Sequence, residues 1–133
     1  SALARLKPTL VLEDATVPRS KIPAMVSAIE KLAVKYDIPI STFGHAGDGN
    51  LHPTLLTDRR DAALWERVEH CVADLFDAAL SLGGTLSGEP GIGIAKAGFM
   101  KNEVGQSSID FCRTMKAAID PNNILNPGKI IGR

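Results

Sequence analysis

The sequence predicts an α+β domain in which helices flank a largely antiparallel sheet and a helical tail closes the chain. Two patterns favour this fold class. Short β-branched or alternating segments are bounded by proline or glycine, as strands are, and three longer segments repeat apolar residues at helical spacing. Because two of the strands follow one another after a short connection, we expect antiparallel pairing between them.

The first strand and the first helix occupy the N-terminal part of the chain. Residues 9–17 are β-branched and partly alternating, and Pro18 follows them, which predicts a strand. Ser20 is the expected N-cap of the next helix, and Pro23 is tolerated in the first turn of that helix. Its apolar residues recur at helical spacing and are Ile22, Met25, Val26, Ile29, Leu32, Ala33 and Tyr36.

A strand pair and a long helix are predicted in the middle of the chain. The strands cover residues 38–43 and 51–56, and a glycine-rich loop over residues 44–50 joins them. The longest helical pattern covers residues 61–82. Gly83 follows it directly, in the position where glycine commonly ends a helix.

The last third of the chain begins with a second glycine-rich segment, residues 87–93. A final helix is predicted over residues 107–119, and Asp120-Pro121 ends it because proline does not continue a helix. The tail that follows contains residues 125–129. At this length we expect one domain that covers residues 1–133.

The composition is that of an ordinary globular domain, with 44% hydrophobic and 23% charged residues. Fifteen basic and fifteen acidic residues balance, and aromatic residues make up only 5%, so the composition favours neither nucleic acid nor an anionic membrane as a partner. No apolar run approaches the roughly 20 residues of a membrane span. The first residues lack the pattern of a signal peptide, and because no initiator Met precedes the first strand we expect a fragment of a longer protein.

The two cysteines, Cys71 and Cys112, lie in separate helical patterns and far apart in the sequence. We expect buried free thiols here and no disulfide between them. Free thiols are typical of a reducing compartment, so the sequence predicts a cytoplasmic location.

Two of the three histidines, His45 and His52, flank the Gly-Asp-Gly-Asn turn of the first glycine-rich segment. Pairing of the strands around this turn would bring both imidazoles to the same end of the strand pair. Glu89 in the second glycine-rich segment is the candidate third ligand. Two imidazoles and one carboxylate leave open positions on a divalent metal such as zinc, manganese or iron. A pair of histidines alone is more often structural, so this prediction depends on the joint setting of all three residues.

The glycine-rich segments fit none of the common phosphate- or calcium-binding motifs. No Lys-Ser or Lys-Thr follows the glycines of residues 88–93, as a P-loop requires, and the dinucleotide fingerprint is incomplete there. The run Asp48-Gly49-Asn50 does not continue as an EF-hand loop. The third histidine, His70, lies inside the long helical pattern, where we expect a structural role.

Four segments match known motifs in the right order. Residues 44–53 are similar to G-H-x-G-D-G-N-L-H-P, and residues 87–93 are similar to S-G-E-H-G-I-G. Residues 125–129 read L-N-P-G-K, and residues 13–20 are similar to E-D-x-x-V-P-R-S. Together they resemble the FAD-linked oxidase C-terminal domain family, which includes the glycolate oxidase flavin subunit, D-lactate dehydrogenases and D-2-hydroxyglutarate dehydrogenase.

The resemblance implies an FAD enzyme that oxidises a 2-hydroxy acid, of the glycolate or D-lactate type, by hydride transfer to flavin. An upstream domain would hold most of the FAD, and this chain would be half of a ferredoxin-like cap domain, inactive by itself. Residues that match the family's motifs are implied to be metal ligands (His45, His52 and Glu89), a substrate-contacting amide (Asn50) and a tail residue near the flavin (Asn126). An iron–sulfur or other electron-acceptor subunit is a further expected partner.

The sequence departs from the family at Pro90, where the resemblance places a histidine as the general base. Proline has no titratable group, and general-base help is typically worth about 10²–10⁴-fold in rate. Another group then serves as the base, or the reaction proceeds without one, or the protein is a poor catalyst. Two alternative functions stay open: a non-catalytic binding or regulatory module of the same fold, and a hydrolase in which the metal activates water.

Overall fold

A computed structural model describes residues 2–131 and divides the chain into two compact units, residues 1–88 and residues 89–133. The first unit has the order β1 (Thr9–Leu12), β2 (Ala15–Thr16), α1 (Ile22–Tyr36), β3 (Ile40–His45), β4 (Asn50–Thr57) and α2 (Ala62–Ser81). The second unit contains α3 (Met100–Ile119), and short 3-10 turns precede α1 and α3.

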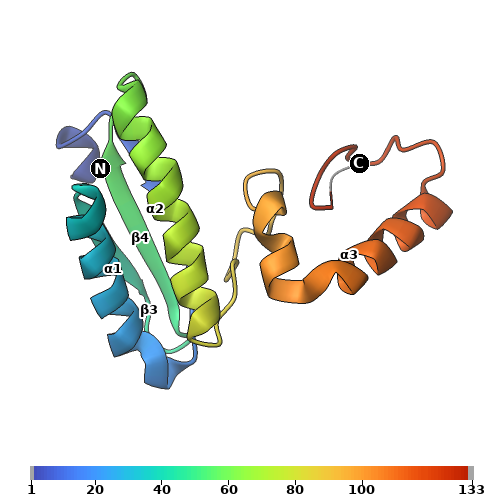
Figure 1. Cartoon of the computed structure of the whole chain (residues 1–133), viewed down its shortest axis with the longest axis horizontal. Coiled ribbons are helices and arrows are strands. Elements are labelled where there is room, and N and C mark those ends of the chain that lie inside the picture. Colours follow the sequence, from blue (N-terminus) through green and yellow to red (C-terminus); the bar gives the residue numbers. More distant parts are fainter. Residues whose placement is uncertain (1, 132–133) are drawn as a thin grey trace. The chain divides into compact units, whose positions relative to one another are not determined.

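The sheet of the first unit is antiparallel throughout, which confirms the predicted α+β class. Strand β4 lies at its centre, with β3 along one edge and both β1 and β2 along the other. Helices α1 and α2 lie side by side and cover one face of this sheet (Figure 1). Apolar side chains of β4, above all Leu51 and Leu55, pack against the two helices and form the core.

The single strand predicted over residues 9–17 is two strands in the structure. Leu12 pairs with Thr54 and Ala15 pairs with Leu51, so β1 and β2 keep one register along β4. Between them the N–H of Glu13 donates to the carbonyl of Pro53, at 3.1 Å. Because Pro53 has no N–H to donate in return, the ladder loses one hydrogen bond at this point. A proline on the partner strand therefore divides β1 from β2.

Helix α1 begins two residues later than the predicted N-cap. A 3-10 turn covers Arg19–Lys21, and no side chain caps the helix, so the assignment of Ser20 as N-cap was wrong. Helix α2 begins as expected, because the Asp61 carboxylate accepts the N–H of Leu64 at 3.0 Å. It ends before Gly83, which has a φ of +78°.

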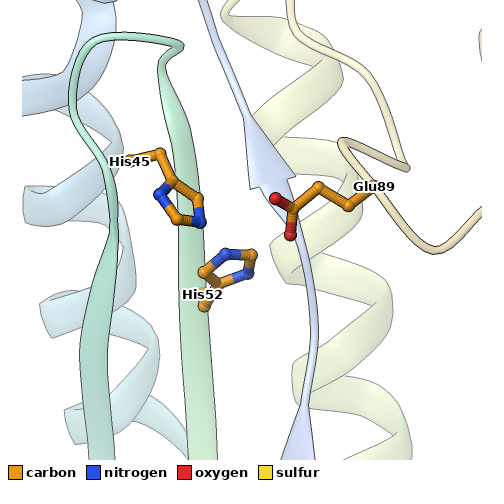
Figure 2. A group of neighbouring side chains, drawn as sticks. All are labelled: His45, His52 and Glu89. Atoms are coloured by element: carbon orange, nitrogen blue, oxygen red, sulfur yellow. The ribbon is translucent and has the colours of Figure 1, made fainter.

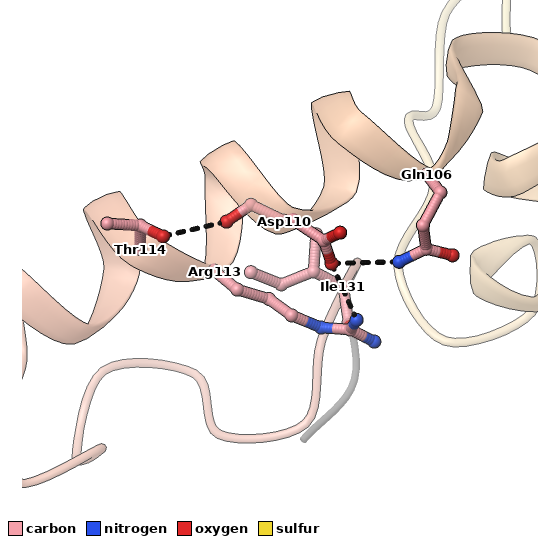
Figure 3. Close-up of polar contacts among 5 residues, drawn as sticks. All are labelled: Gln106, Asp110, Arg113, Thr114 and Ile131. Atoms are coloured by element: carbon pink, nitrogen blue, oxygen red, sulfur yellow. Dashed lines mark hydrogen bonds and ion pairs between the residues drawn. The ribbon is translucent and has the colours of Figure 1, made fainter.

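Helix α3 of the second unit is longer than predicted and is interrupted. Gly105 has φ 76° and ψ 164°, which breaks the helix into a short first turn and a longer segment that matches the predicted 107–119. Asp110 accepts hydrogen bonds from Gln106 and Arg113, and Arg113 also donates to the carbonyl of Ile131 (Figure 3). These contacts tie the tail to the helix.

Both cysteines are free, as predicted, but they differ in burial. Cys71 of α2 lies in the core, whereas Cys112 of α3 is exposed, so the expectation that both are buried was wrong. The α3 pattern places Ile109, the residue three positions earlier, in the buried position instead. Among the described residues, none of the helices has the length and apolar character needed to cross a membrane.

Candidate metal centre

The register of the β3–β4 hairpin places both histidines on one face of the sheet. His45 pairs with Asn50, and Phe43 pairs with His52. Side chains alternate between the two faces of a strand, and Leu51 of β4 points into the core beneath the helices. His45, Asn50 and His52 therefore lie on the opposite face, which we call the distal face. The two imidazoles meet edge to face, with ring centroids 5.3 Å apart.

The connection between the two strands is shorter than the predicted loop over residues 44–50. Strand β3 extends to His45 and β4 begins at Asn50, so four residues form the turn. The carbonyl of His45 accepts the N–H groups of both Asp48 and Gly49. Gly49 has a φ of +76°, and a Cβ added there would lie 2.0 Å from the carbonyl oxygen of Val17. The turn therefore needs glycine at this position, and it holds His45 on a paired strand.

Glu89 completes a group of three side chains with metal-ligating atoms. One such atom from each of His45, His52 and Glu89 lies within 4.8 Å of the other two (Figure 2). Zinc–nitrogen bonds are about 2.0–2.1 Å long, so ligand atoms around one ion are about 3–4 Å apart. His45 and Glu89 are exposed, which leaves their side chains room to close the remaining distance, whereas His52 is buried. The donor set fits a divalent ion with open coordination positions.

Gly88 fixes the backbone next to Glu89. Its N–H donates to Oδ2 of Asp14 at 3.2 Å. A Cβ added to Gly88 would lie 2.4 Å from Nδ2 of Asn50 and 2.5 Å from Oγ1 of Thr16, so the backbone is packed directly onto side chains of the distal face. Glycine allows this close approach because it has no side chain.

Asp14 is the residue of this site that sequence reasoning missed. Its side chain is 1% exposed, and its Oδ1 lies 3.0 Å from Nδ1 of His52. In the sequence it belongs to a predicted strand and to the segment similar to E-D-x-x-V-P-R-S, and neither pattern predicts a role for it. The available signal was an acidic residue within a segment predicted as a strand, because a carboxylate that becomes buried there needs a partner.

The structure places the remaining predicted site residues as follows. Asn50 is buried, and its Oδ1 accepts a hydrogen bond from Oγ1 of Thr16 at 2.8 Å, so it joins β4 to β2 beside the histidines. Pro90 follows Glu89 and is exposed. Asn126 lies in the tail of the second unit and has a φ of 47°. The predicted roles of Asn50 and Asn126 towards substrate and flavin stay predictions.

Residues 1–130 match the family model of the FAD linked oxidases, C-terminal domain. The chain belongs to this family. It is 57% identical over its whole length to the glycolate oxidase subunit GlcD of Bacillus subtilis, of which it covers 28%, and 35% identical over 98% of its length to GlcD of Escherichia coli K12, of which it covers 26%. Over 94% of its length it is 38% identical to a D-lactate dehydrogenase of Archaeoglobus fulgidus, of which it covers 27%. The chain thus spans about a quarter of the length of these relatives.

Proposed function

We propose that this chain is the substrate- and metal-binding part of an FAD-dependent oxidoreductase that converts a 2-hydroxy acid to the 2-oxo acid. The observation that carries the proposal is the convergence of His45, His52 and Glu89 from two separate segments of a chain that belongs to the family. The names of the relatives favour glycolate or D-lactate as the type of substrate. FAD would be held mainly by an upstream domain.

The donor set suits the recognition of a 2-hydroxy acid. Two neutral imidazoles and one carboxylate would leave a divalent zinc, manganese or iron ion with net positive charge and open positions. Such an ion, when bound, supplies Lewis acidity and lowers the pKa of a hydroxyl group next to it. His45, His52 and Glu89 would thereby hold the carboxylate and the 2-hydroxyl of the substrate together at one end of the distal face.

Apolar side chains next to the histidines would exclude water from the substrate. Phe43 and Leu12 lie on the distal face and are 50% and 53% exposed in this chain. The Phe43 ring lies 5.6 Å from the ring of His52. FAD, when bound, supplies the acceptor for the hydride that leaves the 2-carbon. The task of this chain is therefore to orient the substrate carboxylate and to keep the 2-carbon in an apolar setting.

This chain has few groups that could accept the hydroxyl proton of the substrate. Pro90 occupies the position after Glu89 and has no group that accepts a proton. His45 and His52 are committed to the metal, and His70 lies on α2. We propose that this chain supplies no general base for the step. The same substitution favours the alternative function, a binding or regulatory module of the same fold without catalysis.

Flavin reduction in the full-length protein distinguishes these two functions. The longer protein that contains this chain would be purified with FAD and mixed anaerobically with glycolate, D-lactate, L-lactate and D-2-hydroxyglutarate. Loss of the oxidised-flavin absorbance with one of these acids is the expected result. A protein that binds zinc through His45 and His52 but whose flavin stays oxidised with every acid would contradict the catalytic proposal and support the binding module.

A further inference from the structure

We propose that Asp14 is a positioning residue that orients two of the metal ligands at once. One carboxylate oxygen faces the imidazole of His52, and the other accepts the backbone N–H of Gly88, the residue that precedes Glu89. The inference rests on the proposed metal centre. It adds a role for a side chain that is not one of the three whose ligand atoms lie close together.

The register of the sheet explains why Asp14 meets His52. Strands β1 and β2 keep one register on both sides of their interruption, because Leu12 pairs with Thr54 and Ala15 with Leu51. Asp14 therefore lies directly opposite His52 on the distal face. Side chains directly opposite one another on antiparallel strands have Cβ atoms about 4.5–5.5 Å apart, which suits a hydrogen bond between a carboxylate and an imidazole.

The contact decides which ring nitrogen of His52 carries the lone pair that a metal would bind. A carboxylate only accepts hydrogen bonds, so the proton of the neutral imidazole lies on Nδ1, at 3.0 Å from Asp14. The lone pair is then on Nε2, at the far side of the ring. Both side chains are largely buried, 9% exposed for His52 and 1% for Asp14, so water competes little for this hydrogen bond. Carboxylate–imidazole pairs of this kind fix the tautomer and the ring orientation of metal-binding histidines.

The second oxygen of Asp14 fixes the backbone that carries Glu89. Oδ2 accepts the N–H of Gly88 at 3.2 Å, and Gly88 packs against Asn50 and Thr16 with no space for a Cβ. The Glu89 side chain starts from the next residue, so its carboxylate is held near the imidazoles through this contact. Two ligands from distant parts of the sequence thus depend on one buried side chain.

The test compares Asp14→Asn with Asp74→Asn in the 133-residue chain. Asp74 also accepts two hydrogen bonds, from Lys35 and Tyr36, but it lies on α2. Zn²⁺ binding would be measured by titration calorimetry, and the tautomer of His52 by ¹⁵N-resolved NMR of the metal-free chain. We expect Asp14→Asn to weaken Zn²⁺ binding by about 10–100-fold and to move the imidazole proton from Nδ1 towards Nε2. Asp74→Asn should change neither.

A second variant tests the role of Asp14 at the Glu89 backbone separately from its role at His52. It also provides a test if Asp14→Asn fails to fold. Gly88→Ala should displace the backbone beside Glu89 and weaken Zn²⁺ binding, while the His52 tautomer stays as in the parent chain. Circular dichroism of the metal-free variants shows whether each is folded. If Asp14→Asn folds, an unchanged His52 tautomer together with an unchanged Zn²⁺ affinity would overturn the proposal. If Asp14→Asn does not fold, an unchanged Zn²⁺ affinity of Gly88→Ala would overturn it.

The experiment also distinguishes an error in the proposed metal centre from an error in the role of Asp14. If the parent chain does not bind Zn²⁺, the proposed ligand set is wrong. The tautomer measurement still reports on Asp14 in that case, because it uses the metal-free chain. A His52 ring with its proton on Nε2 in the parent chain would overturn the positioning role whatever the metal does.

Discussion

His45 and His52 face one another across the β3–β4 hairpin, with ring centroids 5.3 Å apart and ring planes at 89°. The hairpin register produces this arrangement. His45 lies opposite Asn50, and His52 lies two residues further along β4, on the same face. Because the period of a strand is two residues, a shift of the register by one would carry His52 to the core side. The placement of the two histidines is thus a property of the sheet.

The first prediction concerns the ligands. Replacing His45 or His52 by Ala, or Glu89 by Gln, should weaken Zn²⁺ binding to the chain by at least about tenfold, since each change removes a donor atom from the ion. Titration calorimetry after exhaustive dialysis against a chelator is the measurement. His70→Ala is the matched control and should bind as the parent chain does. Equal loss in the control would show that the zinc binds elsewhere.

The second prediction concerns the turn that follows His45. Gly49→Ala should destabilise the chain by at least about 1–2 kcal/mol, because alanine is strained at positive φ and its Cβ would meet the carbonyl oxygen of Val17. Gly47→Ala, two residues earlier, is the control, since a Cβ there meets nothing within 4 Å. Urea unfolding followed by circular dichroism compares the two. Equal stability of both variants would contradict the close approach of Gly49 to Val17 in this turn.

The third prediction concerns the missing base. In the full-length flavoprotein, Pro90→His should raise the rate of flavin reduction by a 2-hydroxy acid by about 10²-fold, the lower end of general-base help. Pro90→Ala removes the ring without adding an imidazole and should not do so. Stopped-flow measurement of the oxidised-flavin absorbance reads out the rate. Fast reduction in the parent protein that neither variant changes would place the proton acceptor elsewhere.

The fourth prediction concerns the two thiols. Burial raises the pKa of Cys71 to about 11, and the nearby Asp74 carboxylate adds to this, so its thiol stays protonated at neutral and mildly alkaline pH. Because the thiolate is the reactive form, a disulfide reagent should modify Cys112 quickly and Cys71 only after the chain unfolds. Mass spectrometry with and without denaturant shows which residue carries the label. Rapid labelling of both cysteines in the folded chain would contradict the burial of Cys71 in the core.

Local patterns were sufficient for most of the fold. Alternation and apolar spacing predicted the strands and helices of the first unit. Asp61 marks the start of α2 because its side chain accepts the N–H of Leu64, and Gly83 follows its end because glycine adopts a positive φ. The predictions that were wrong concern features that depend on residues close in space but distant in the sequence. The interruption between β1 and β2 comes from Pro53 on another strand, and no spacing within residues 9–17 contains that information.

For the candidate site, the sequence by itself determined the ligand types, the glycines that permit tight turns, and the family. Only the tertiary structure decided that Asp14 lies against His52, and that Gly88 docks beside Asn50 so that Glu89 approaches both imidazoles. The hydrogen bonds of Asp14 with His52 and with Gly88 join residues that are 38 and 74 positions apart in the sequence. Strand register and chain packing set such pairs, and periodicity along the chain describes only which side of its own strand or helix a residue occupies.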